Sequence, residues 1–398
     1  MNKIYLFLSI LISILSCKKT DQKTQADIDI LKKAQRIHLT TTTIDTHDDI
    51  DIENFTGSIN YSQNTNTKVN LPKMDIGALD VVWLIVYTKQ GELSSSGYSK
   101  AAENAKSKFD AIHRLTEVYA PKKIGLATNS KQIDSLIKIG KKVAMIGVEN
   151  AYPIGEDLNE VRRYYEMGAR YMSLAHNGHN QFSDSNTGEF DNTSKHNGIS
   201  ELGKKVIDSM NHYGIMVDIS HPSKEAIRQT ILHSKTPIIA SHSAARSLSD
   251  HPRNLDDQQL EWIKESGGVI QTVALGRFVN KEKHERYEAA LNAHDGDLDE
   301  KALEKIKKEF PPVDVADFVD HIDYIKNKIG IDHVGISSDF DGGGGIEGWQ
   351  DASETFNVTL ELVKRGYTEK EIAQIWSGNL LRVLDQTQNI ANNLQNRN

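Results

Sequence analysis

The sequence has a single cysteine, Cys17, among its 398 residues. One cysteine cannot form a disulfide within the chain, so stability must come from the hydrophobic core and from any metal that binds the folded state. There is also no excess of positive charge, because 47 Lys and Arg residues face 55 Asp and Glu residues, for a net charge of −8. Since phosphate binding requires a basic surface, this composition argues against a nucleic-acid partner.

The sequence also lacks the short motifs of several enzyme classes. It contains no P-loop, no H-E-x-x-H motif and no G-x-S-x-G nucleophile elbow. The sequence therefore gives no support for nucleotide hydrolysis by a P-loop protein, for a zinc protease of the H-E-x-x-H class or for a serine hydrolase. A G-x-G-x-x-G pattern at 343–348 has little chain after it, whereas a dinucleotide site needs a complete βαβ unit. We therefore interpret 343–348 as a loop.

The apolar run at 4–15 is too short to span a bilayer, which takes roughly 20 residues. It follows Lys3 and ends in the segment ILSC, so residues 1–16 resemble the signal peptide of a bacterial lipoprotein, in which the cysteine is lipidated. An ordinary secretory signal with an unrelated cysteine, or a short uncleaved anchor, is the alternative interpretation. We expect an exported protein held on the periplasmic or cell-surface side of a bacterial membrane only through the lipid on Cys17.

The rest of the chain is expected to form one domain, residues 37–385. The polar segment 17–36 predicts a tether and an entry helix, and the Asn- and Gln-rich segment 386–398 predicts a flexible tail. Within the domain, apolar runs such as VVWLIVY and VAMIGVE alternate with helical periodicity, which is typical of strands covered on both faces. The expected strands are 40–45, 79–87, 142–149, 170–175, 215–219, 237–241, 268–274 and 333–338. The expected helices are 101–119, 159–167, 199–212, 224–233, 256–265 and 353–365.

Eight strands that alternate with helices favour a closed α/β barrel of the (β/α)₈, or TIM barrel, type over a doubly wound open sheet, which is the alternative. Two segments interrupt the alternation. Residues 54–70 are polar and predict a long loop after the first strand, and residues 281–308 are highly charged with helical spacing. Both would lie at the C-terminal ends of strands, where barrel enzymes place segments that cover the substrate. Solvated surface helices are the alternative for 281–308.

Side chains that can bind metals or transfer protons occur at the ends of most expected strands, where a barrel builds its active site. They are His47, Asp49, Glu149, His176, His221, His242 and Asp339. His47 and Asp49 form an H-x-D pair. Because side chains at i and i+2 of a strand share one face, these two can hold one cation together. Singly, each has an ordinary explanation, such as a hydrogen-bonded histidine or a helix-capping aspartate. Apart from His176, the set offers three imidazoles and three carboxylates, which suits Zn²⁺ but exceeds one tetrahedral site. We therefore expect two metal ions bridged by a carboxylate and a hydroxide.

Eight short segments, spread along the whole domain, together carry a family resemblance. In order, they are IDTHDDI, IGVEN, YMSLAHNGHNQFSDS, VDISHPS, PIIASHSAAR, DHPRNL, HVGISSDFDG and GNLLRVL, from about residue 40 to 385. Together they resemble the membrane (renal) dipeptidase family of the metal-dependent amidohydrolase superfamily. The resemblance implies a two-zinc dipeptidase on a (β/α)₈ barrel, a dipeptide substrate, and an association into homodimers.

The resemblance implies a role for each metal ligand. His47 and Asp49 would bind the first Zn²⁺, Glu149 would bridge both ions together with a hydroxide, and His221 and His242 would complete the second site.

It also implies three roles in catalysis and substrate binding. Asp339 would shuttle the proton beside the bridging hydroxide, and His176 would stabilise the developing oxyanion. Arg253 would hold the free carboxylate of the substrate, for which its forked guanidinium is suited.

Two features depart from the family pattern. Residues 150–152, Asn-Ala-Tyr, follow Glu149 where relatives have small residues, and His179 has no assigned role. We expect both to lie beside the substrate pocket, so the sequence does not determine which dipeptide side chains are preferred. The alternatives are another amide or a β-lactam as the substrate of the same metals, and a non-catalytic binding lipoprotein, which the intact ligand set disfavours.

Overall fold

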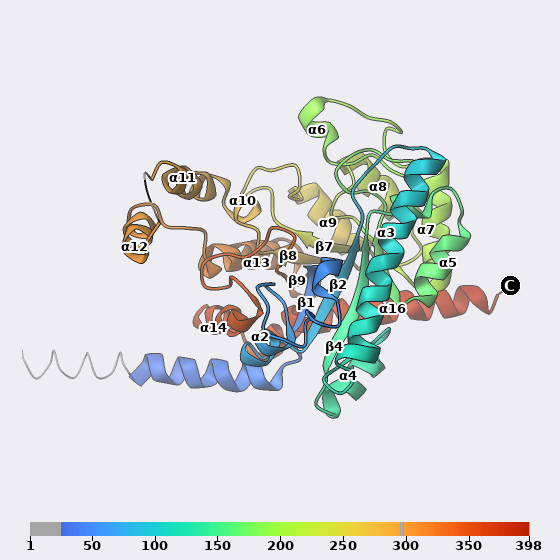
Figure 1. Ribbon diagram of the computed structural model, residues 1–398. Helices are drawn as coiled ribbons and strands as arrows, with labels where there is room; N and C mark the ends of the chain where they lie inside the picture. Colours follow the sequence, from blue (N-terminus) through green and yellow to red (C-terminus); the bar gives the residue numbers. More distant parts are fainter. Residues whose placement is uncertain (1–24, 295, 297, 398) are drawn as a thin grey trace, which may run out of the picture.

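The computed structural model describes residues 25–397 apart from 295 and 297, and it contains a parallel barrel surrounded by helices (Figure 1). The strands are β1 (Ile44–Asp49), β2 (Val81–Tyr87), β3 (Ile124–Leu126), β4 (Lys142–Glu149), β5 (Ala169–Ser173), β6 (Met216–Asp218), β7 (Ile239–Ser243), β8 (Val269–Val273) and β9 (Val334–Ser337). They pair in the order β1-β2-β4-β5-β6-β7-β8-β9, and β3 pairs with β4 outside this path. A parallel bridge between Asp48 and Phe340 joins the last strand to the first. The predicted (β/α)₈ barrel is therefore confirmed.

The barrel interior is a packed core and leaves only one end for a site. Inside it, the rings of Trp83 and Tyr171 stack with their centroids 4.9 Å apart. Apolar side chains from the first residues of the strands continue this core, and Leu380, Val383 and Leu384 of helix α16 (Asn379–Gln395) join them. Helix α16 thus covers the N-terminal mouth of the barrel. The C-terminal mouth, where the strands end, is free to hold a site.

The helices surround the barrel, and most begin at a side chain that caps the first turn. Ser94, Asn129, Ser200 and Asp256, for example, each accept a backbone N–H three residues ahead. The other helices are α2 (Leu71–Ile76), α3 (Ser95–Arg114), α4 (Ser130–Lys138), α5 (Asn159–Glu166), α6 (Gly188–Asp191), α7 (Glu201–Tyr213), α8 (Lys224–His233), α9 (Asp257–Glu265), α10 (Gly276–Val279), α11 (Lys281–Asn292), α12 (Glu300–Glu309), α13 (Val315–Ile329), α14 (Phe356–Lys364) and α15 (Glu369–Ala373).

The first strand begins later than predicted. Residues 25–40 form one helix, because Ala34 and Ile37 are buried in the core and hold the helix beyond residue 36. The strand expected at 40–45 is therefore β1, which begins at Ile44 and carries the H-x-D pair within it. As a result, both side chains of that pair are positioned by strand backbone and not by a loop.

Other boundaries also differ from those predicted. The charged segment 281–308 forms two helices, α11 and α12, and neither contains a buried residue, as expected of solvated surface helices. The short elements β3 and α4 were not predicted. The segment 386–398 was expected to be a flexible tail, yet α16 runs through it to Gln395, because Thr387 and Ala391 are buried.

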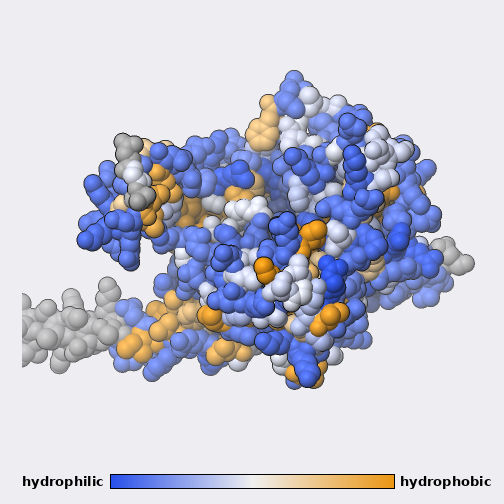
Figure 2. Space-filling model, viewed as in Figure 1, coloured by the Kyte–Doolittle hydropathy of each residue, from blue (hydrophilic) through white to orange (hydrophobic). Residues whose placement is uncertain are grey.

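The surface is mainly hydrophilic, with exposed apolar side chains such as Leu31 and Leu39 on helix 25–40 (Figure 2). Within the described part of the chain, no helix combines the length and the apolar character that crossing a membrane requires. Residues 1–16 and Cys17, on which the lipoprotein prediction rests, lie outside the described residues.

Candidate metal centre

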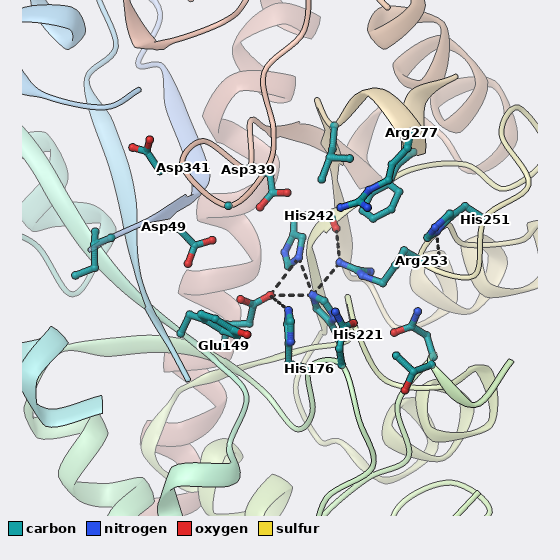
Figure 3. A pocket seen from close by; sticks show the side chains of 18 of the residues that line it. Asp49, Glu149, His176, His221, His242, His251, Arg253, Arg277, Asp339 and Asp341 are labelled. Atoms are coloured by element: carbon teal, nitrogen blue, oxygen red, sulfur yellow. Dashed lines mark hydrogen bonds and ion pairs between the residues drawn. The ribbon is translucent and has the colours of Figure 1, made fainter. Parts of the chain in front are cut away.

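The predicted site residues meet at the C-terminal mouth of the barrel (Figure 3). His47 and Asp49 lie in β1, Glu149 ends β4, and His242 lies in β7. His176, His221 and Asp339 follow β5, β6 and β9 by two or three residues. All of them except His47 line a pocket with a volume of about 690 Å³, and His47 is fully buried beneath it.

The hydrogen bonds of His47 determine which of its nitrogens faces the pocket. The Tyr171 hydroxyl donates its only hydrogen to the Thr46 carbonyl, so it must accept from Nδ1–H of His47, 2.9 Å away. Nε2 of His47 is buried without a hydrogen-bond partner. It lies 3.7 Å from Oδ2 of Asp49 and 3.8 Å from Oε2 of Glu149. Facing carboxylates at these distances, Nε2 of His47 favours a positive charge, which either a bound metal ion or a proton can supply.

His242 is oriented by the same kind of relay. The Ser241 hydroxyl donates to Oδ2 of Asp218 at 2.7 Å, so it accepts from Nδ1–H of His242 at 2.9 Å. Nε2 of His242 then carries a lone pair and lies 3.1 Å from Nε2 of His221. Oε1 of Glu149 lies 2.8 Å from Nε2 of His221 and 3.4 Å from Nε2 of His242. Two imidazole nitrogens and a carboxylate oxygen thus converge on one point.

Three overlapping groups in the described residues have their ligand atoms within 4.8 Å of one another. They are His47–Asp49–Glu149, Glu149–His221–His242 and His47–His242–Asp339. Glu149 belongs to the first two, with one oxygen toward each. This donor set of imidazoles and carboxylates fits Zn²⁺ and similar metals, and the first two groups overlap at Glu149. The residues present therefore fit a metal centre.

Burial and neighbouring charges set the protonation of these ligands. Burial, with the charge of Arg253 or of His47, holds the pKa of His221 and of His242 well below the usual range, so both are neutral and able to bind a metal. Burial opposes the charge on Glu149, but the neighbouring histidines outweigh it and hold the pKa of this carboxyl well below its usual range. Burial also lowers the pKa of His47, yet the adjacent carboxylates, Glu149 first, raise it to about 9. Without a metal, a proton on His47 supplies the positive charge that the carboxylates require.

Asp339 is held above the centre by an unusual backbone conformation. Its φ of 59° lies in the left-handed region, which aspartate tolerates better than most residues, and the N–H of Gly344 donates to its carbonyl at 2.7 Å. A side chain at Gly342 would collide with the carboxylates of Asp49 and Asp339, so glycine is required there. Burial raises the pKa of Asp339 to about 7, which suits a group that exchanges protons near neutral pH.

Arg253 is buried at the side of the centre, although it lies in a loop between β7 and α9. Its guanidinium donates to the carbonyls of Ser220 and His242 and lies 3.1 Å from Nε2 of His221. Burial lowers its pKa to about 10, so it stays charged at neutral pH. The ring of His176 packs against that of His221, with centroids 4.1 Å apart, and Nε2 of His176 lies 3.8 Å from Oε1 of Glu149.

The two departures from the family pattern turn out to be structural. His179 accepts the N–H of Ser185 and bonds to Thr193 at 2.9 Å, so it holds the segment before α7 and does not line the pocket. Asn150 has a φ of 79° and donates to the Thr88 carbonyl, and Tyr152 lines a neighbouring cavity. Neither lines the pocket of the metal centre itself, but the cavity at Tyr152 lies beside that pocket, because Tyr87 and Lys108 line both.

Sequence reasoning missed several residues of the site. The orienting groups Tyr171, Asp218 and Ser241 lie on strands, and the two-residue alternation of a strand could have placed Tyr171 inside the barrel. The remaining lining residues carried no signal, since they belong to the end of β2, to helices α3 and α10 and to loops, and only the folded chain brings these segments together. They include Asp51, Tyr87, Lys108, His251, Arg277, Phe278 and Asp341.

Several known proteins are similar to this chain. The family model described as membrane dipeptidase (peptidase family M19) matches residues 31–398. "Dipeptidase verJ" of Clonostachys rogersoniana is 32% identical over 286 residues, which cover 71% of this chain and 65% of that protein. "Dipeptidase 3" of Mus musculus is 28% identical over 358 residues, 87% of this chain and 64% of that protein. The chain thus spans less than two thirds of the length of either relative.

Solved structures show the same barrel. The probable dipeptidase PvdM from Pseudomonas aeruginosa matches with a TM-score of 0.80 at 30% identity, over 91% of this chain and 99% of that one. A metallopeptidase from Rhodobacter sphaeroides, liganded with a phosphinate mimic of the dipeptide L-Ala-D-Ala, shares the fold with a TM-score of 0.71 at 19% identity, over 87% and 99% of the two chains.

Proposed function

The chain belongs to the membrane dipeptidase family, and on this premise we propose that it is a zinc-dependent dipeptidase. The substrate would be a dipeptide with a free C-terminal carboxylate. Support comes from the joint presence of metal-binding side chains, a proton-exchanging carboxyl group and a buried arginine in one pocket. Each of these three parts has a separate task in hydrolysing a peptide bond.

His47 and Asp49 would hold one Zn²⁺, His221 and His242 the other, and Glu149 would contribute one oxygen to each. The support is the orphaned Nε2 of His47 and the convergence of the other nitrogens on Glu149. Bound Zn²⁺ supplies the chemistry that these side chains lack, because it polarises a carbonyl and lowers the pKa of water toward 7.

The protein's own residues would position the substrate. The guanidinium of Arg253 has N–H groups beyond those that bond to Ser220 and His242, and these can hold the C-terminal carboxylate of a dipeptide. Holding that end limits the substrate to a short peptide, because the scissile bond must then lie one residue away. Nε2 of His176, which lines the same pocket, would donate to the carbonyl oxygen as negative charge develops there.

Asp339 would carry the proton. It accepts one from the attacking water and delivers it to the nitrogen of the leaving amino acid, so that the C–N bond breaks as the amine becomes neutral. A carboxyl group with a pKa raised to about 7 in the metal-free protein can serve in both directions near neutral pH.

The observation that carries the proposal is the pairing of the ligand cluster with the buried Arg253 in one pocket. The test is a panel of L,L- and L,D-dipeptides, their C-terminal amides and a β-lactam, assayed on metal-free protein before and after addition of Zn²⁺. We expect zinc-dependent hydrolysis of free dipeptides and much slower hydrolysis of the amides. Protein that binds two equivalents of Zn²⁺ and hydrolyses none of the dipeptides would refute the proposal.

We also propose that the chain is exported and held on a bacterial membrane through a lipid on Cys17. The support is the sequence alone, namely an apolar run behind Lys3 that ends at the only cysteine.

A further inference from the structure

Two cations that line the pocket, Lys108 and Arg277, have no role in the proposed mechanism. Lys108 lies on the side of the carboxylates, where the charges of Asp49 and Glu149 act on its ammonium group. Arg277, the second residue of α10, lines the same pocket as Arg253 and is exposed. Among the described residues, no carboxylate lies within 4.0 Å of its guanidinium. The nearby Arg246, which does not line the pocket, is instead paired with Glu189 at 2.9 Å and with Asp250 at 2.8 Å.

Arg277 and Arg253 share one aromatic ring. Each guanidinium carbon lies 5.5 Å from the centroid of the Phe278 ring, and Phe278 is itself buried. The ring of His251 packs on Phe278 with centroids 4.6 Å apart, and Nδ1 of His251 accepts the backbone N–H of Arg253. These contacts fix the two arginines at one side of the pocket, which we call the cationic wall (Arg253, Arg277 and His251).

The two sides of the pocket carry opposite charge. In Figure 3, Asp49, Asp339 and Asp341 lie on one side, and the cationic wall lies on the other with the Arg277 guanidinium directed into the pocket. Burial lowers the pKa of His251 to about 4, and the positive charges of Arg253 and Arg277 contribute to this shift. The wall thus has more positive charge than a single carboxylate needs.

A bound dipeptide is oriented by this polarity. Its ammonium group belongs on the side of the aspartates, and its C-terminal carboxylate belongs on Arg253. The side chain of the C-terminal residue, which is next to that carboxylate, would then lie on the same side of the pocket as Arg277.

We infer that Arg277 binds a second carboxylate, carried by the side chain of the C-terminal residue, so that the enzyme prefers dipeptides ending in aspartate or glutamate. This inference rests on the proposed dipeptidase function. A guanidinium without a partner, placed beside another that holds the main-chain carboxylate, matches the two acidic groups of such a residue. Arg277 is therefore a specificity-determining residue and takes no part in bond cleavage.

The test compares kcat/KM for pairs of dipeptides that differ in charge and hardly in size. Ala-Glu is compared with Ala-Gln, and Ala-Asp with Ala-Asn, with the C-terminal residue in its L- and in its D-form. We expect the wild-type protein to prefer the acidic member of each pair. Arg277→Gln should lower this preference about three- to tenfold, the range expected for a partly exposed ion pair, and Arg277→Glu should favour Ala-Lys over Ala-Gln.

The matched control is Arg246→Gln, which removes the same charge outside the pocket and should leave the acidic preference unchanged. Calorimetric binding of glutamate and glutamine to the zinc-loaded proteins gives a second readout that does not depend on turnover. Arg277→Gln should weaken the binding of glutamate more than that of glutamine.

Two results would overturn the inference while the dipeptidase function stands. One is a wild-type protein that hydrolyses neutral dipeptides without preferring acidic ones. The other is an Arg277→Gln protein that loses the same factor on every dipeptide, because Arg277 would then share the main-chain carboxylate with Arg253. Failure of the zinc-loaded wild-type protein to hydrolyse any dipeptide would overturn the proposed function and, with it, this inference.

Discussion

Nε2 of His221 and Nε2 of His242 lie 3.1 Å apart, and Oε1 of Glu149 lies within 3.4 Å of both. The hydrogen bonds from Asp218 through Ser241 fix the Nδ1–H tautomer of His242. Nε2 of His242 therefore carries a lone pair, which it can donate to a metal ion. A metal ion at this point would be bound by all three atoms. The arrangement explains why removing the shared carboxylate should be more damaging than removing any one histidine.

Glu149→Gln should reduce the metal content from two ions per chain and lower kcat/KM by at least about 100-fold, because an amide oxygen is a poor bridge between cations. Metal analysis, the dipeptide assay and far-UV circular dichroism check the three parts of this expectation. The fold should be retained, since the substitution preserves shape. A folded Glu149→Gln protein with full activity would contradict the bridging role.

Tyr171→Phe removes the acceptor that fixes the tautomer of His47 without touching a ligand. We expect the affinity for Zn²⁺ to fall about 10- to 100-fold, as is typical when the hydrogen-bond partner of a metal-binding histidine is lost. Competition with a zinc chelator measures this affinity. Tyr164→Phe is the matched control, because Tyr164 is another buried tyrosine, on α5 and outside the pocket. Equal losses in both variants would point to a general packing effect.

Asp339 should give the metal-free protein a distinctive pH dependence. Its pKa in the folded state is about 7, above the ordinary value of 3.8, so the folded state favours the protonated form. The stability that it contributes is fully present below pH 3.8 and is lost as the pH rises through 7. Asp339→Asn should therefore unfold at a higher urea concentration than wild type at pH 8, and the difference should shrink toward pH 4. An equal difference at both pH values would show that ionisation of Asp339 is not the cause.

The same variant tests the catalytic role of Asp339. Because asparagine also tolerates a φ near 59°, Asp339→Asn should fold normally and bind metal, yet lose about 10²- to 10⁴-fold in kcat. Steady-state kinetics on the zinc-loaded protein measures this loss. A large rise in KM with unchanged kcat would instead assign Asp339 to substrate binding.

Arg253→Lys keeps the positive charge but loses the fork that can hold a carboxylate with two hydrogen bonds. We expect kcat/KM for free dipeptides to fall about 10- to 100-fold, while the difference between free and amidated dipeptides shrinks. The measurement is the ratio of kcat/KM for Ala-Ala and Ala-Ala amide in each protein. An unchanged ratio would remove Arg253 from carboxylate recognition.

Cys17→Ala should release the protein from the membrane fraction of a bacterial host into the soluble fraction. Only a cysteine can carry the thioether-linked lipid of a lipoprotein. Fractionation followed by immunoblotting measures the distribution, and mass spectrometry of the wild-type N-terminus reports the lipid directly. Wild-type protein that is soluble and carries an unmodified cysteine would show that the anchor is absent.

The amino-acid sequence by itself determined the barrel and the types of its ligands. Continuous apolar runs between helical segments can only be buried as parallel strands covered on both faces, and parallel strands bring their C-terminal ends together. For that reason a histidine or a carboxylate at the ends of six of the eight runs, from His47 to Asp339, was enough to predict a shared site.

Only the tertiary structure decided how these residues are oriented and what surrounds them. The tautomer of His47 depends on Tyr171, which is 124 positions away in the chain, and burial of Arg253 depends on the carbonyls of Ser220 and His242. Arg277 had no signal in the sequence, because its place in the pocket with Arg253 follows from the path of the chain after β8. Hydrogen-bond direction, burial and unpaired charge arise from contacts between distant segments, so they cannot be read from local patterns.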